Sequence, residues 1–154
     1  APVLGATAVA LAACGGDEPP PEAIDVAPSP TVEKSEALLD DLALIGAYEG
    51  TLAIYPELRG SLAGIADQHR AHARELGATE EDITKLEPIP PKAANAREAI
   101  TNLISRERRA AEQRAQTAEQ SESAEQVRVF TFMAASKASH VPELRDIRSG
   151  VSRS

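Results

Sequence analysis

The sequence predicts an all-α protein built as a four-helix bundle, and three observations support this. In four segments after residue 30, apolar residues recur at intervals of three, four or seven, the spacing of one face of an α-helix. Proline, glycine and serine separate these segments. No segment alternates apolar and polar residues in the manner of a half-buried strand. The core must come from Leu, Ile, Val and Ala, because aromatic residues make up only 3% of the chain.

The first 13 residues are an uncharged run of small and apolar side chains, APVLGATAVALAA. A helix needs about 20 such residues to cross a bilayer, so residues 1–13 are interpreted as the remnant of a signal peptide that lacks its basic start. The end of this run and the two residues after it, LAACG at 11–15, resemble the lipobox of bacterial lipoproteins. The resemblance implies that Cys14, the only cysteine, carries a lipid and holds the protein on the extracytoplasmic face of the cell membrane. The alternative is an incidental cysteine after an alanine-rich segment.

Residues 14–30 form a proline-rich and acidic linker. Such a composition favours an extended, solvated spacer over a helix or strand. We expect this spacer to lift a folded domain, residues 31–148, off the membrane surface, and residues 149–154 to form a tail.

The first helix is predicted from Thr31, a suitable N-cap, to Ile54, shortly before Pro56. The second begins between Pro56 and Ser61 and ends at Gly77. The apolar stripe of the first helix consists of Leu38, Leu42, Ile45 and Leu52. The stripe of the second helix consists of Leu62, Ile65, His69, His72 and Leu76.

A connection over residues 78–91 follows, in which residues 79–82 have the pattern that caps one short turn. It is long enough to run the height of a bundle. The sequence therefore allows both an up-down-up-down arrangement and one in which this connection crosses over.

The third helix is predicted over residues 92–120, with an arginine-rich outer face that indicates a solvated surface more than an anionic partner. The fourth follows Ser123, and Pro142 predicts a kink or an early end. The stripe of the third helix consists of Ala96, Ile100, Leu103, Glu107 and Ala110. The stripe of the fourth helix consists of Phe130, Met133, Lys137, His140, Leu144 and Ile147.

Composition excludes several classes of function. With 16 basic and 24 acidic residues the formal net charge is −8, which argues against a nucleic-acid partner. A single cysteine excludes an internal disulfide framework and a cysteine-based zinc site. The sequence also lacks a glycine-rich phosphate loop and a nucleophile elbow.

Titratable side chains interrupt the stripe of every predicted helix. A buried charge without a partner costs several kcal/mol, about the stability of a small domain, so these side chains should meet one another or a metal ion. If the last two helices are antiparallel about residues 121–123, Glu107 and His140 are equidistant from the turn and face each other. The candidate side chains are Glu49, His69, His72, Glu107, Lys137 and His140.

The first helix of each pair carries a carboxylate, and the second carries a residue-x-x-His motif. This pattern resembles that of the ferritin-like superfamily. Those bundles carry Glu on two helices and Glu-x-x-His on the other two, and hold two iron or manganese ions. The resemblance covers residues 31–148. With the segment DQHRAHARELG, residues 67–77, the chain is most similar to ferritin-like lipoproteins of unknown function from high-GC Gram-positive bacteria. The repeat of His-x-x-Glu-Leu at His72 and His140 is consistent with a duplicated hairpin.

The departures from this pattern define three hypotheses. His69 and Lys137 stand where the resemblance expects bridging glutamates, and we expect Lys137 to pair with Glu107 in place of a metal. We favour a lipid-anchored binding or interaction module that has lost its metal chemistry, is not an enzyme and has no cofactor, with a partner that the sequence does not name. The alternative is an envelope protein that binds one transition-metal ion through His69, His72 and a glutamate. A two-metal oxidase is the third hypothesis.

Overall fold

The computed structural model describes residues 30–151, and side chains from residue 35 onward. This part of the chain is helical and contains no strand, which confirms the all-α prediction. Residues 1–13, which we interpret as a signal-peptide remnant, lie outside the described residues, as do Cys14, almost all of the expected linker and the last three residues of the expected tail. The elements are α1 (Pro30–Ile54), the 3-10 turn η1 (Pro56–Leu58), α2 (Arg59–Glu75), α3 (Glu80–Thr84), α4 (Ala96–Gln120) and α5 (Ala124–Gly150).

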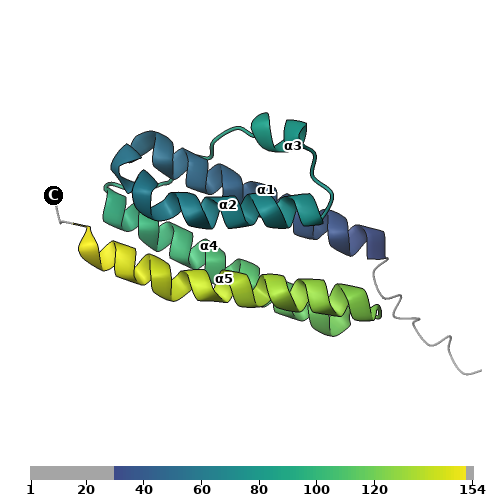
Figure 1. The fold of residues 1–154 in the computed structure, drawn as a ribbon. Coiled ribbons are helices and arrows are strands. Elements are labelled where there is room, and N and C mark those ends of the chain that lie inside the picture. Colours follow the sequence, from purple (N-terminus) through teal and green to yellow (C-terminus); the bar gives the residue numbers. More distant parts are fainter. Residues whose placement is uncertain (1–29, 152–154) are drawn as a thin grey trace, which may run out of the picture.

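The four long helices form two antiparallel pairs, α1 with α2 and α4 with α5 (Figure 1). At one end of the molecule, a core cluster joins the last turns of α1 and α5 to the first turns of α2 and α4 through Leu52, Leu62, Ile100 and Leu144. At the opposite end, Ala37, Leu76, Ala118 and Phe130 form a second cluster. Both α2 and α4 begin at the first cluster and end at the second, so these two helices run in the same direction.

The connection between α2 and α4 therefore crosses the length of the molecule, which decides between the two topologies that the sequence allows. The connection begins at Gly77, whose φ of 104° suits glycine. It continues into α3, where the Thr79 side chain accepts a hydrogen bond from the Asp82 amide at 3.2 Å and Asp82 accepts one from the Thr79 amide at 2.8 Å. The short capped turn expected at residues 79–82 is thus confirmed.

Residues 85–95, here called the strap, lie against α1 (Figure 1). The Ile89 amide donates a hydrogen bond to the Gly46 carbonyl at 2.8 Å. A Cβ added at Gly50 would lie 2.0 Å from the Ile89 carbonyl oxygen, so only glycine lets the strap approach α1 this closely. The strap also delays α4, which begins at Ala96 instead of near Lys92, after Asn95 caps it by accepting from the Glu98 amide at 2.9 Å.

Helix α5 continues through Pro142 to Gly150, so an early end at Pro142 is wrong. Proline removes the hydrogen bond to the carbonyl of Ala138, but Ala138 is exposed and water can satisfy that carbonyl. Val141 and Leu144 are buried, and their packing holds the last turns of the helix against the core.

Candidate functional site

Each long helix contributes to a polar cluster between the two apolar ends of the molecule. Its ionisable members are almost fully shielded, with exposed fractions from 0% to 7%. We call this group the central polar cluster. It consists of Asp41 and Tyr48 from α1, His69 and His72 from α2, Glu107 from α4, and Lys137 and His140 from α5.

Glu107 is the acceptor around which one half of the cluster is arranged. Its Oε1 atom accepts a hydrogen bond from the Tyr48 hydroxyl at 2.7 Å and lies 2.6 Å from Nε2 of His69. Nδ1 of His140 lies 3.4 Å from the same oxygen. The prediction that Glu107 and His140 face each other is therefore confirmed.

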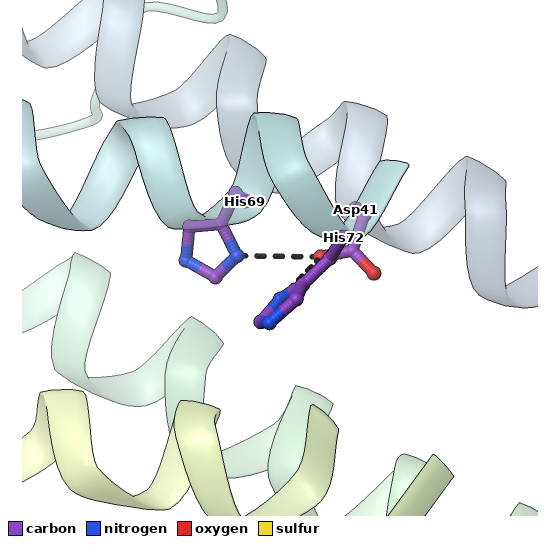
Figure 2. Close-up of side chains that lie close together, drawn as sticks. All are labelled: Asp41, His69 and His72. Carbon is purple, nitrogen blue, oxygen red and sulfur yellow. Dashed lines mark hydrogen bonds and ion pairs between the residues drawn. The ribbon is translucent and has the colours of Figure 1, made fainter. Parts of the chain in front are cut away.

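Asp41 organises the other half. Its Oδ1 atom lies 3.2 Å from Nδ1 of His69 and accepts a hydrogen bond from the ammonium of Lys137. Figure 2 shows His69 directing a ring nitrogen at Asp41, and the ring of His72 close to the same carboxylate oxygen. Nδ1 of His72 is 3.9 Å away from Oδ1. His69 is thus the link between the two carboxylates.

The two carboxylates are ionised in spite of their burial. Burial raises the pKa of Glu107, but the neighbouring imidazoles of His140 and His69 outweigh burial and lower the pKa to about 2. Burial likewise opposes ionisation of Asp41, and hydrogen bonding with His69 and the charge of Lys137 bring its pKa below the ordinary value.

The positive charges come from His69 and Lys137. Burial lowers the pKa of His69, but hydrogen bonds with Asp41 and Glu107 raise it above the ordinary value. Both ring nitrogens of His69 face carboxylate oxygens, so an imidazolium satisfies both contacts. An imidazolium and an ammonium then balance the two carboxylates.

His72 remains neutral, because burial and the positive charge of Lys137 lower its pKa to about 4. Its Nδ1 atom is buried and has no hydrogen-bond partner among the described residues. Its ring contacts the exposed Phe132, with centroids 6.1 Å apart. His72 is therefore the member of the central polar cluster that lies nearest the surface of the molecule.

The structure does not bring Glu49 into the central polar cluster. The Glu49 side chain is 32% exposed and pairs with Arg70 of α2 at the surface. The reason is helical phase. Tyr48 lies seven residues after Asp41 and shares its face of α1, whereas Glu49 is turned a further 100° about the axis.

Asp41 and Tyr48 are the residues that the sequence reasoning missed. A signal was present, because Ala37, Asp41, Leu44, Tyr48 and Leu52 follow one another at steps of three and four. The partner expected for Lys137 is also wrong. Lys137 pairs with Asp41 across the molecule and not with Glu107, which is already occupied by Tyr48, His69 and His140.

Two groups within the cluster have ligand atoms within 4.8 Å of one another, as a metal ion requires. One consists of Asp41, His69 and His72, and in it the ammonium of Lys137 is bound to the carboxylate. The other consists of His69, Glu107 and His140.

The second group also has outer hydrogen bonds of the kind that orient metal ligands. Nδ1 of His69 faces Asp41, the Tyr48 hydroxyl donates to Glu107, and Nε2 of His140 lies 3.0 Å from the side-chain oxygen of Gln68. These contacts leave Nε2 of His69 and Nδ1 of His140 directed at Glu107. Together with Glu107, these two nitrogens form a set of two imidazoles and one carboxylate.

His140 shows why a cation suits this place. If its Nε2–H donates to Gln68, a neutral His140 has only a lone pair on Nδ1, and that lone pair faces the carboxylate of Glu107 at 3.4 Å. Nδ1 of His140 and Oε2 of Glu107 are buried atoms without hydrogen-bond partners among the described residues. A proton or a metal ion would relieve this contact.

The residues do not fit two metal ions. Two divalent ions need more carboxylate oxygens than Asp41 and Glu107 provide, and the ammonium of Lys137 is already bound to Asp41. One ion, held by His69, Glu107 and His140, fits the donor set.

Comparison with known proteins adds no assignment: no family model, no curated protein and no solved structure matches the chain. Among residues 30–151, no helix has both the length and the apolar character needed to cross a bilayer.

The finding that Asp41, and not Glu49, is the α1 carboxylate of the central polar cluster can be tested by comparing Asp41→Asn with Glu49→Gln. We expect Asp41→Asn to lower the free energy of unfolding by about 3–5 kcal/mol, because it leaves Lys137 buried without its carboxylate. Glu49→Gln should cost at most about 1 kcal/mol, because it removes a partly exposed pair. Urea denaturation measures both, and equal effects would contradict the assignment.

Proposed function

We propose that this protein is a lipid-anchored protein of the bacterial cell envelope whose ferritin-like helical domain binds one transition-metal ion and has lost two-metal chemistry. The observation that carries the proposal is the set of His69, Glu107 and His140, with ligand atoms within 4.8 Å of one another and an oriented outer hydrogen bond on each residue. The ion is the cargo of this protein, and no reaction is assigned to it.

The arrangement of the helices supports the ferritin-like part of the proposal. Ferritin-like bundles have one long crossover connection, and they draw their metal ligands from all four helices. In this chain the strap supplies the crossover, and Asp41 and Glu107 supply a carboxylate from the first helix of each pair. His72 and His140 occupy the histidine positions on the second helices.

The ligand types indicate the class of ion. Imidazole nitrogen suits Zn, Cu, Ni and Fe, and two imidazoles with one carboxylate favour these ions over Mg²⁺ or Ca²⁺. Metal binding requires Nε2 of His69 to lose its proton. The proton on Nδ1 of His69 remains, and Nδ1–H continues to donate a hydrogen bond to Asp41. The metal therefore replaces a proton, and we expect its affinity to fall as the pH is lowered through the range in which His69 becomes protonated.

A second candidate function is the metal-free interaction module that the sequence favours. It is supported by the charge balance of the central polar cluster, in which protonated His69 and Lys137 neutralise Asp41 and Glu107 without an added ion. The number of metal ions bound per chain separates the two candidates.

Protein purified without a histidine tag and titrated with Zn²⁺ should bind one ion per chain, measured by calorimetry and elemental analysis. Glu107→Gln and His140→Ala should each weaken binding by about tenfold or more, since both remove a ligand. Glu49→Gln is the matched control and should leave binding unchanged. An absence of specific binding favours the metal-free module, and two bound ions would restore the oxidase hypothesis.

The ferritin-like part of the proposal predicts that the double variant His69→Glu/Lys137→Glu gains a second ion. It places Glu-x-x-His on both α2 and α5, opposite Asp41 and Glu107, and so supplies the missing carboxylates. We expect Mn²⁺ or Fe²⁺ to bind at two ions per chain, and thermal stability to depend on the metal because the added carboxylates repel one another without it. A folded double variant that binds no more than one ion would contradict the kinship.

The anchoring part of the proposal rests on Cys14. Expression from a full-length gene in a bacterium with lipoprotein-processing enzymes should yield a membrane fraction in which Cys14 is the first residue and carries acyl chains, detected by mass spectrometry. Cys14→Ser should leave the protein unacylated and release it from the membrane fraction. Recovery of acyl chains on the Cys14→Ser variant would contradict this assignment.

A further inference from the structure

A groove follows the seam between α1 and α4, and its charge differs from that of the rest of the molecule. It consists of two adjoining hollows of about 440 and 220 Å³ that share Arg106 and Arg109. The larger hollow is closed on one side by the strap, including Pro90 and Pro91, and its lining also contains Lys92. We call the two hollows together the α1–α4 groove.

The α1–α4 groove carries positive charges without partners in a chain whose net charge is −8. Lys92, Arg106 and Arg109 are exposed, and none of them forms an ion pair with another described residue. The larger hollow contains no acidic residue. In the smaller hollow the one acidic residue is Asp40, whose carboxylate is bound by Arg114. The groove therefore lacks a counter-charge.

The floor of the groove is made of small and apolar residues. Ala47, Ala99 and Leu103 line the larger hollow, and Ala43 and Ala110 line the smaller one. A groove with an apolar floor and basic sides suits an extended, acidic segment that carries proline and small residues.

Residues 15–29 have this composition. They contain four acidic residues, no basic residue and four prolines. They precede Pro30, the first residue of α1, and α1 forms one wall of the groove. Direct attachment to the wall keeps the effective concentration of the segment at the groove in the range of about 1 mM or more.

The lengths also agree. Ala47 lies about 25 Å along α1 from Pro30, at a rise of 1.5 Å per residue. A proline-rich extended chain advances about 3.1 Å per residue, so Glu22, eight residues before Pro30, also reaches about 25 Å. Folded back along α1, Glu22 comes to the level of Arg106 and Arg109.

We propose that residues 15–29 fold back along α1 and dock in the α1–α4 groove through ion pairs with Lys92, Arg106 and Arg109. Asp17 and Glu18 lie further along the segment and reach the end of the groove where Lys92 lies. Docking determines which face of the helical domain is turned toward Cys14. The proposal is independent of metal binding and of acylation.

A spin label next to Glu22 tests the docking in the full chain. The label is attached at Ala23→Cys in a Cys14→Ser background, and line broadening of backbone amides is measured by NMR at low and high salt. We expect broadening of amides near Arg106 and Arg109 at low salt, weakened at high salt because exposed charges are screened. If the amides near Arg106 and Arg109 show no broadening at low salt in the protein with an unchanged groove, the proposal is overturned.

Charge-reversal variants separate docking by charge from simple proximity. Arg106→Glu/Arg109→Glu should abolish the broadening, and adding Glu18→Lys/Glu22→Lys/Asp25→Lys should restore it. Arg108→Glu/Arg128→Glu is the matched control, because these exposed arginines line neither hollow. Broadening that persists in Arg106→Glu/Arg109→Glu overturns the proposal. Binding of the groove to phosphatidylglycerol vesicles without intramolecular broadening overturns it as well, and assigns the groove to anionic lipid.

Discussion

The structure depends on the need to neutralise two carboxylates in the middle of a helical core. Asp41 and Glu107 are both fully buried and come from helices of different pairs. An uncompensated charge in such a place costs several kcal/mol, an amount comparable with the whole stability of a small domain. His69 reaches both carboxylates with one ring, and this contact joins the two helical pairs.

The same contact limits the chemistry that the core can support. The Lys137 side chain pairs with Asp41, so it occupies the place of a cation in one half of the central polar cluster. In the other half, a proton on His69 neutralises the carboxylate of Glu107. A metal ion can take the place of that proton, but it cannot take the place of the Lys137 side chain. The cluster is therefore asymmetric, with one fixed and one exchangeable positive charge. This asymmetry is the reason why the donor set fits the one ion proposed above and does not fit two.

The rest of the fold holds this polar centre in place. Apolar side chains occupy the two ends of the molecule, and the ionisable groups lie between them. The connection between α2 and α4 crosses from one end to the other, and its strap packs on Gly46 and Gly50 of α1, where the absence of side chains allows backbone contact. Because the strap leads α4 back to the end where α2 began, it sets the direction in which α4 presents Glu107 to His69.

The sequence alone determined the helices, most of their buried faces and the Glu107–His140 contact. Each of these depends on local periodicity or on counting residues across a short turn, and both are properties of neighbouring residues. The start of α4 was displaced, because the strap uses residues 92–95 before Asn95 caps the helix.

Only the tertiary structure decided that Asp41 and not Glu49 enters the core, that Lys137 pairs with Asp41, and that the middle connection crosses over. Several acidic residues of α1 are compatible with a helical stripe of limited apolar character, and the rotation of α1 against α2 selects among them. The partner of Lys137 lies 96 residues away in the chain, so it depends on how the two helical pairs dock. No periodicity within one helix encodes that distance, because it is set by the packing of all four helices together.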